Sequence, residues 1–305
     1  MKSKKVIILL SSYNGEKYIE EQLNSIFAQD YSNFELLVRD DGSTDETIKI
    51  LKKFQTCNDN MHVEYGKNIG FFKSFLWLLK NANIADYYAF CDQDDYWDVN
   101  KISYAVEKMS LQNKNIPILY FTNYLICDKN LNSLEFSKNI NDPSHLERAL
   151  IANQCPLGFN TVINYNLKKY IDNLDLRDLN IWGHDYWCYL IALSFGKVIY
   201  DTRSSAKYRR HEKNVSKYEK RFISRQILRI KKFIIDDDYS PIKKTVELFY
   251  KKYSNDMDSK TKETFQLFAT RNLISNFKKA LYYKKYSDSN FDEIAIRFLL
   301  LIGKL

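Results

Sequence analysis

Short apolar runs alternate with stretches of helical periodicity through the first hundred residues. The apolar runs predict buried strands at Val6–Leu10, Phe34–Asp40, His62–Tyr65 and Tyr87–Cys91. Apolar residues spaced three and four apart predict helices over Glu16–Phe27, Ser43–Phe54 and Gly70–Ala82. Ser43, with Glu46 three residues later, has the form of a capping box. Strands and helices that alternate at these lengths predict βαβ crossovers and a parallel sheet.

Polar clusters follow three of these strands. They are SSYNGE (11–16), RDDGSTD (39–45) and DQDDYWD (92–98). The carboxyl ends of parallel strands meet at one edge of a sheet, and ligands of such sheets bind beyond that edge. We therefore expect the three clusters to line one crevice.

The remainder of the chain is less regular. It predicts strands at Ile118–Cys127, Thr161–Tyr165 and Lys197–Asp201, and helices at His184–Phe195, Arg221–Ile235 and Glu263–Leu281. We predict a first domain over residues 1–217, with two halves over 1–105 and 106–217. A basic helical region over 218–305 would follow it.

Charge is distributed unevenly along the 305 residues. Residues 1–202 hold 21 basic and 26 acidic side chains, a net charge of −5, whereas residues 203–305 hold 25 and 12, a net charge of +13. The basic helices could pack on the preceding domain, form a homodimer or make a peripheral contact with an anionic membrane. Nucleic acid is not expected as a partner, because no recognition module is present and the body is acidic.

The cysteines and the apolar runs indicate a compartment. Five scattered cysteines, never arranged as CxxC, fit a reducing environment. Val6–Leu10 is too short for a signal-peptide core, and no run approaches the roughly 20 apolar residues of a spanning helix. We expect a cytoplasmic protein, peripheral at the inner face of the cell membrane if the basic helices reach it.

The stretch FCDQDDYWD places four carboxylates within seven residues, at Asp92, Asp94, Asp95 and Asp98. Like charges this close raise the free-energy cost of ionising one another unless a cation lies among them. Carboxylate oxygens suit Mn²⁺ or Mg²⁺, and such ions are commonly shared with substrate phosphates. The cluster therefore predicts a divalent metal bound to a diphosphate, with an acidic surface turn as the alternative.

Several segments resemble a known family. SSYNGEKYIEEQLNSIFAQ, LLVRDDGSTDET, KNIGFFKSF and FCDQDDYWDVNKI, over about residues 5–105, resemble the family 2 inverting glycosyltransferases. Weaker similarity in CPLGFNTVINYNL, WGHDYWCYLIA and YRRHEKNVS is to bacterial rhamnosyltransferases of cell-wall and capsular polysaccharide synthesis. The resemblance implies an α/β protein of the GT-A fold: a Rossmann-like, mostly parallel sheet flanked by helices, here with a C-terminal basic helical extension. It also implies that residues 1–217 are the catalytic domain, with a nucleotide-sugar-binding half (1–105) and an acceptor-binding half (106–217).

The resemblance also implies roles for matching residues. The nucleotide-sugar-binding set is Ser11, Tyr13, Asp40, Asp41, Asn68, Gly70, Lys73, Asp92, Asp94 and Asp95. Asp92 and Asp94 match the DxD motif of the family and would bind metal together with His211. Arg209 and Arg210 could pair with phosphate. A surface role for His211 and a simple helix-capping turn at Asp40 and Asp41 are the alternatives.

Asp185 is the implied catalytic base, since the acceptor hydroxyl must lose a proton as it attacks the sugar. Relatives often carry an acidic pair here, whereas this chain has His184-Asp185. Trp182 and His184 are the implied acceptor-binding residues. A helix N-cap role for Asp185 and a core position for Trp182 or Trp187 stay open.

These expectations define an inverting hexosyltransferase. L-rhamnose from dTDP-rhamnose is the expected donor sugar, and a glycan or lipid-linked oligosaccharide of a bacterial surface polysaccharide is the expected acceptor. One alternative is a UDP-hexose transferase (galactose, glucose or N-acetylglucosamine) of the same fold. Another is a non-catalytic protein that binds nucleotide sugars or glycans. A nicotinamide-dependent oxidoreductase is disfavoured because the first turn lacks GxGxxG.

Overall fold

A computed structural model describes residues 3–153, 155–176, 181–212 and 239–305. The chain forms two compact units. The sheet unit comprises Met1–Pro143, Pro156–Leu179 and Phe195–Asn214, and the helical unit comprises Ser144–Cys155, Asn180–Ser194 and Val215–Leu305. The predicted boundary at residues 217 and 218 and the predicted helix Arg221–Ile235 lie outside the described residues.

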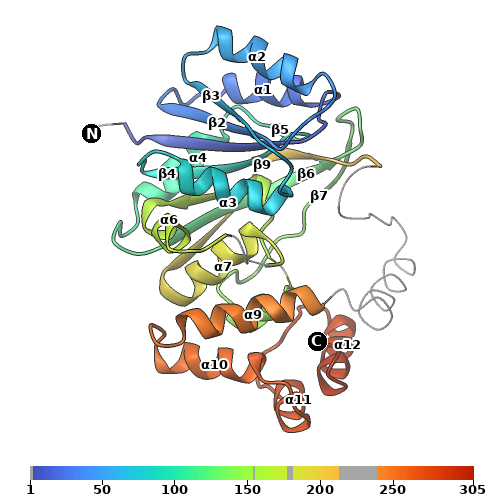
Figure 1. The fold of residues 1–305 in the computed structure, drawn as a ribbon. Helices are drawn as coiled ribbons and strands as arrows, with labels where there is room; N and C mark the ends of the chain where they lie inside the picture. Colours follow the sequence, from blue (N-terminus) through green and yellow to red (C-terminus); the bar gives the residue numbers. More distant parts are fainter. Residues whose placement is uncertain (1–2, 154, 177–180, 213–238) are drawn as a thin grey trace. The chain divides into compact units, whose positions relative to one another are not determined.

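The sheet unit is built on one mixed sheet (Figure 1). Its strands are β1 (Val6–Ser12), β2 (Phe34–Asp40), β3 (Met61–Tyr65), β4 (Tyr87–Asp92), β5 (Tyr96–Trp97), β6 (Ile118–Cys127), β7 (Ser133–Phe136), β8 (Thr161–Asn164) and β9 (Lys197–Arg209). The strand order is β3-β2-β1-β4-β8-β6-β9-β5, with β7 paired to β6. Strands β3, β2, β1 and β4 pair in parallel as predicted.

Beyond β4 the pairing changes direction. Strand β8 is antiparallel to both β4 and β6, whereas β6 and β9 are parallel. The short β5 pairs antiparallel with the far end of β9, so that Tyr96 lies opposite Lys207 and Trp97 opposite Ala206. Strand β9 runs to Arg209, well past the predicted end at Asp201. This extension carries the chain back to the loop that follows β4.

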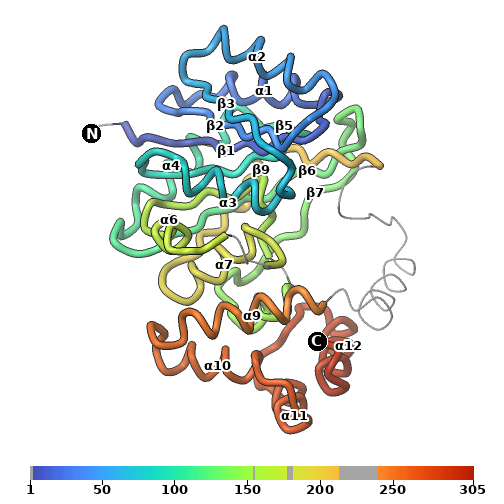
Figure 2. Tube along the Cα trace, viewed as in Figure 1, coloured from blue at the N-terminus to red at the C-terminus, as the bar shows by residue number. Residues whose placement is uncertain are grey.

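Helices cover both faces of the sheet. They are α1 (Ile19–Phe27), α2 (Thr47–Cys57), α3 (Phe71–Asn81), α4 (Lys101–Ser110) and α6 (Tyr165–Asp172), and a 3₁₀ turn spans Gly158–Asn160. Figure 2 shows α3 and α6 on the same side of the sheet, and the two helices contact each other. On that side, Phe75 of α3 packs edge-on against Phe90 of β4, with ring centroids 5.8 Å apart.

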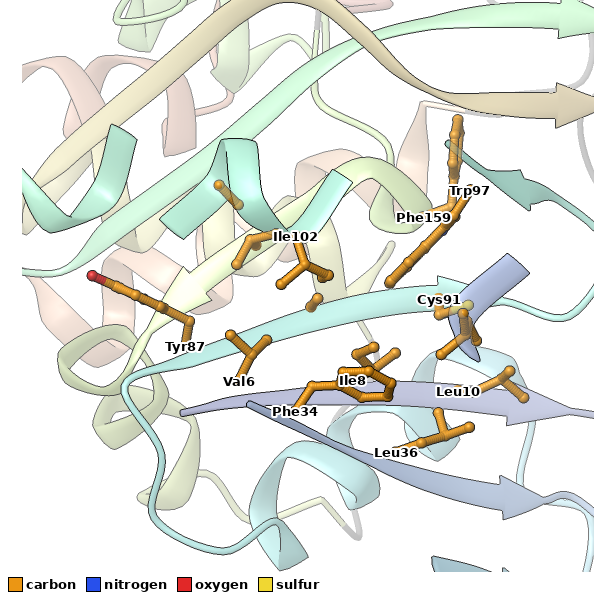
Figure 3. Packing of buried hydrophobic residues seen from close by; sticks show 14 of the residues in the cluster. Val6, Ile8, Leu10, Phe34, Leu36, Tyr87, Cys91, Trp97, Ile102 and Phe159 are labelled. Carbon is orange, nitrogen blue, oxygen red and sulfur yellow. The ribbon is translucent and has the colours of Figure 1, made fainter. Parts of the chain in front are cut away.

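Alternate side chains of β1 form the core of the opposite face, since successive strand residues point to opposite sides. Val6, Ile8 and Leu10 belong to a buried cluster with residues of β2, β4, α1 and α4 (Figure 3). Trp97 and Phe159 extend this cluster to the strand end that carries Cys91. The apolar core therefore runs up to the edge where the polar clusters begin.

The helical unit contains α5 (Leu146–Leu150), α7 (His184–Phe195), α9 (Ser240–Tyr253), α10 (Ser259–Ala269), α11 (Leu273–Ala280) and α12 (Asn290–Leu301). Trp187 of α7 is fully buried and packs edge-on against Phe249 of α9, with ring centroids 5.1 Å apart. Tyr239, just before α9, donates a hydrogen bond to the Leu150 carbonyl at 2.9 Å. None of the described helices is long and apolar enough to cross a membrane.

Two predictions of local structure were wrong. The capping box at Ser43 does not form, because α2 begins only at Thr47 and the Ser43 hydroxyl donates instead to Asp40. The single helix predicted over Glu263–Leu281 is two helices, α10 and α11. Asn272 breaks it by forming a capping box with Ser275 that starts α11 afresh.

Candidate active site

The ends of β1, β2 and β4 meet as predicted. The Asp41 N–H donates to the Ser12 carbonyl at 2.7 Å, which joins the first two polar clusters. Gln93 joins the third to the first: its side-chain oxygen accepts from the Tyr13 N–H at 2.9 Å, and its side-chain nitrogen donates to the Tyr13 carbonyl at 3.0 Å. These bonds confirm one polar edge built from three loops.

Asp40 is buried beneath the turn after β2. Its carboxylate accepts from the Ser12 hydroxyl at 2.9 Å, from the Ser43 hydroxyl at 2.6 Å and from the Ser43 N–H at 2.8 Å. Only 1% of Asp40 is exposed. Within this structure Asp40 therefore holds the turn together, and its role as a nucleotide ligand stays a prediction.

Asp41 holds the loop that precedes α3. Its two carboxylate oxygens accept from the N–H groups of Ile69 and Gly70, each at 2.9 Å, and Arg39 forms an ion pair with it. Gly70 has φ +86°, a conformation that L side chains rarely adopt, although a side chain there would meet open space. A carboxylate at residue 41 and glycine at residue 70 therefore shape the loop together.

Four other residues of the predicted nucleotide-sugar-binding set lie at this edge. The Ser11 hydroxyl donates to Ser74 Oγ at 2.7 Å, and the side-chain oxygen of Asn68 accepts from the Gly70 N–H at 3.1 Å. Tyr13 is 47% exposed, and Lys73 is half-buried in the first turn of α3. An exposed aromatic ring and a cation at a helix N-terminus are groups that suit a base and a phosphate, respectively.

The loop after β4 brings Asp94 to His211. The His211 Nε2 lies 2.8 Å from Asp94 Oδ2, and the two side chains are 11% and 21% exposed. The cause is the pairing of β5 with the end of β9, because it places the residues after Arg209 beside residues 92–95. The two residues are 117 positions apart in the sequence.

Asp95 has a different environment from Asp94. It is completely buried, and its Oδ1 accepts from the Arg209 N–H at 3.0 Å. Burial raises the pKa of the Asp95 carboxyl well above its ordinary value, and the charges of Asp94 and Asp92 raise it further. Asp95 therefore anchors the end of β9 to the loop, while Asp94 faces His211.

Arg209 joins the strand, the loop and α1. Its guanidinium donates to the carbonyls of Asp94 at 2.8 Å and of Lys129 at 2.7 Å, and it forms an ion pair with Glu21. It also lies 4.6 Å from the ring of Tyr18, and that ring in turn stacks on His211 with centroids 4.8 Å apart. Arg209 is only 2% exposed, so its guanidinium holds the loop from the interior of the protein.

Tyr18 and Glu21 were not identified from the sequence. They are three positions apart at the start of α1, so both side chains face the same side of the helix. This spacing was the available signal, but only the pairing of β5 with β9 shows what lies opposite it.

The side chains at this edge are suited to bind a divalent cation. Among the described residues, no three His, Cys, Asp or Glu side chains form a complete ligand cluster. The carboxylate of Asp94 and the imidazole of His211 offer two ligands, and Asp92 is the last residue of β4, two positions before Asp94. Mg²⁺ and Mn²⁺ accept such a partial set when phosphate oxygens supply the remaining positions.

The predicted acceptor residues lie in the helical unit, around the start of α7. Asp185 is half-buried in the first turn, where its Oδ1 accepts from the Tyr186 N–H at 2.8 Å. Gly183 leaves room for it, since a Cβ at residue 183 would lie 2.5 Å from that oxygen. Trp182 is 41% exposed, whereas His184 is 3% exposed. Burial lowers the pKa of His184 to about 4, against a smaller raising effect of Asp185.

A family model described as "Glycosyl transferase family 2" matches residues 7–161. The chain belongs to glycosyl transferase family 2. A dTDP-rhamnosyl transferase, RfbG of Shigella flexneri, is 30% identical over 220 residues, which cover 67% of this chain and 72% of the relative. An Escherichia coli β-1,3-glucosyltransferase named for UDP-Glc and α-D-GlcNAc-diphosphoundecaprenol is 36% identical over 126 residues, covering 41% and 47%.

Solved glycosyltransferases share the fold. Residues 1–349 of Staphylococcus aureus TarS with UDP-GlcNAc give a TM-score of 0.59 at 18% identity, covering 92% of this chain and 76% of that one. A Pyrobaculum calidifontis mannosyltransferase with GDP-Man and Mn²⁺ gives 0.52 at 14% identity, covering 100% and 86%. The protein is thus a glycosyltransferase with the predicted GT-A fold.

Replacing Arg209 by Lys should loosen the loop that carries Asp94. Lysine keeps the charge but cannot donate at once to Asp94, Lys129 and Glu21, so we expect a loss of about 3 kcal/mol in the free energy of unfolding. Urea denaturation measures it. Arg203→Lys is the matched control, because Arg203 is partly exposed and pairs with Asp201 and Glu107 away from this edge. Equal losses in the two variants would contradict the role of Arg209.

His184 should make the protein sensitive to acid. Its pKa is about 4 in the folded chain and 6.5 ordinarily, so its contribution is present above pH 6.5 and is lost as the pH falls toward 4. We expect it to account for roughly 2 to 3 kcal/mol of stability lost between pH 7 and pH 4. The free energy of unfolding, measured by denaturation at several pH values in that range, should depend less on pH in His184→Gln. It should keep its pH dependence in His62→Gln, because His62 is exposed.

Proposed function

We propose that this glycosyltransferase transfers a sugar, with inversion, from a nucleoside-diphosphate donor to a hydroxyl of a bacterial surface-polysaccharide acceptor. The observation that carries the proposal is the Asp94–His211 pair beside the ends of parallel strands. A carboxylate and an imidazole there can share a divalent ion with a diphosphate. The exposed ring of Tyr13 would stack on the base, and Lys73 would approach the phosphates.

Asp185 would act as the general base toward the acceptor. Its carboxylate lies in the first turn of α7, is half-buried, and accepts a hydrogen bond from the Tyr186 N–H through Oδ1. It would accept the proton of the attacking hydroxyl, and the 41%-exposed Trp182 offers a flat apolar surface to a sugar ring. A divalent ion, when bound, would offset negative charge on the departing diphosphate.

L-rhamnose from dTDP-rhamnose is the proposed donor, and its support is the similarity to the rhamnosyl transferase of Shigella flexneri. A UDP-hexose donor is the second candidate, supported by the shorter but 36% identical match to the glucosyltransferase of Escherichia coli. The name of that relative includes a diphosphoundecaprenol, which supports a lipid-linked acceptor. We propose a cytoplasmic enzyme, because its donors are soluble nucleotides.

Donor choice is testable by nucleotide-dependent stabilisation. In the presence of Mn²⁺, dTDP should raise the melting temperature more than UDP or GDP does, because a ligand that binds only the folded state stabilises it. The matching sugar nucleotides are then assayed for hydrolysis and transfer. A larger rise with UDP would favour the UDP-hexose candidate, and no response to any nucleotide with metal would contradict the donor site.

The two aspartates should separate binding from chemistry. Asp94→Asn should abolish both the nucleotide-dependent rise in melting temperature and transfer. Asp185→Asn should keep the rise while transfer falls by about 10²- to 10⁴-fold. Asp59→Asn and Asp256→Asn are controls, because both residues are exposed and lie outside the proposed site. Normal transfer by Asp185→Asn would show that Asp185 is not the general base. If neither the parent protein nor the control variants transferred sugar, a non-catalytic binding protein would be favoured.

A further inference from the structure

Exposed apolar side chains gather on the last two helices. Among the described residues, 21 large apolar side chains are exposed, and ten of them fall within residues 273–302. These ten are Leu273, Ile274, Phe277, Leu281, Tyr283, Phe291, Ile294, Phe298, Leu301 and Ile302. We call them the α11–α12 apolar face. Exposed apolar side chains scattered singly are ordinary, but a concentration of this kind marks an interaction surface.

The exposed side chains form a stripe on each helix. Leu273, Phe277 and Leu281 are spaced by four on α11 and its C-cap, and Ile274 extends the same side. At about 100° per residue they occupy an arc of about 100°. Ser275 and Lys279, both buried, lie on the opposite side of the helix. The outward side of α11 is therefore the apolar one, the reverse of an ordinary surface helix.

Helix α12 shows the same inversion. Its exposed set is Phe291, Ile294, Phe298, Leu301 and Ile302, which recur at intervals of three and four along one side. Glu293, by contrast, is buried, and it accepts hydrogen bonds from the N–H groups of Tyr286 and Ser287 at 2.7 and 2.8 Å. The carboxylate of Glu293 thus forms hydrogen bonds inside the unit, while the apolar stripe faces outward.

The two helices are braced against each other. Arg297 of α12 donates to the carbonyls of Ala280 and Tyr282 at 2.7 and 2.9 Å, and it pairs with Glu293. Tyr286, between the helices, donates to the Lys279 carbonyl at 2.7 Å. The stripes are thus held in place by buried and partly buried polar contacts, so their exposure follows from how α11 and α12 are fixed to each other.

The charge around the face favours a lipid surface. Lys278 adjoins Phe277 on α11, and Lys285 in the connection is also exposed. Residues 273–302 hold five basic and three acidic side chains, and two of the acidic ones are paired, Asp288 with Arg148 and Glu293 with Arg297. A second copy of the chain would bring similarly basic borders together, whereas an anionic membrane complements them.

We propose that the α11–α12 apolar face docks on an anionic membrane surface, with its aromatic and aliphatic side chains in the headgroup region and its lysines at the lipid phosphates. The helices would lie in the interface, since no described helix can span a membrane. This inference is independent of the donor sugar and of the base. With the lipid-linked acceptor proposed above, such docking would bring the enzyme to its acceptor.

Vesicle flotation of the full chain tests the proposal. Phosphatidylglycerol-containing vesicles should carry the protein upward, and pure phosphatidylcholine vesicles should carry much less. Phe277→Ser with Phe298→Ser should weaken binding by about tenfold or more, because apolar area inserted at the interface sets the affinity. The matched control, Ile84→Ser with Leu111→Ser, removes side chains that are 74% and 77% exposed in the sheet unit and should leave binding unchanged.

Added salt should reduce binding, since the lysine contribution is screened. Thermal unfolding and nucleotide binding should be the same in both double variants, because all four positions are exposed. Absence of binding to anionic vesicles would overturn the proposal, as would equal binding by the two double variants. Sedimentation velocity tests whether a second copy of the chain occupies the face instead. If the protein is a dimer that Phe277→Ser with Phe298→Ser makes monomeric, and it does not bind vesicles, the face is a self-association surface.

Discussion

The guanidinium of Arg209 is the interaction on which the polar edge of the sheet unit depends. A single buried cation contacts the loop after β4, the start of α1 and the segment after β6. It does so from the last residue of β9, whose N–H also binds Asp95. Removing such a cation leaves buried acceptors without donors, which is costly in the low-dielectric interior. These contacts therefore hold three separate segments in fixed positions at the place where Asp94 meets His211.

The acidic residues of this edge divide by environment. Asp40, Asp41 and Asp95 are buried and accept hydrogen bonds from backbone N–H groups, so they fix the three loops. Asp94 retains partial exposure beside an imidazole. Electrostatics explains the division, because closely spaced carboxylates remain together only where donors or cations offset their repulsion. The loop-fixing aspartates make it possible for a less constrained one to face a ligand.

The predictable part of the fold was its periodic part. The four parallel strands and the helices between them follow from alternation of apolar runs, and the meeting of three polar clusters follows from parallel topology. The antiparallel insertion of β8 and the length of β9 do not follow, since they depend on pairing between segments far apart in sequence. Position 211 was selected by resemblance alone. Its contact with Asp94 is a product of tertiary pairing that no local pattern of the chain encodes.

Residues of the helical unit come from three stretches of the chain, and α7 is one of them. Trp187 has its aromatic partners on α9, and Tyr186 donates to the Ala149 carbonyl of α5. A shortened protein that stopped near residue 217 would keep α5 and α7 while losing the surfaces they bury against. The C-terminal helices thus share one core with α5 and α7, and their removal would expose the apolar side chains that hold the segment carrying Asp185.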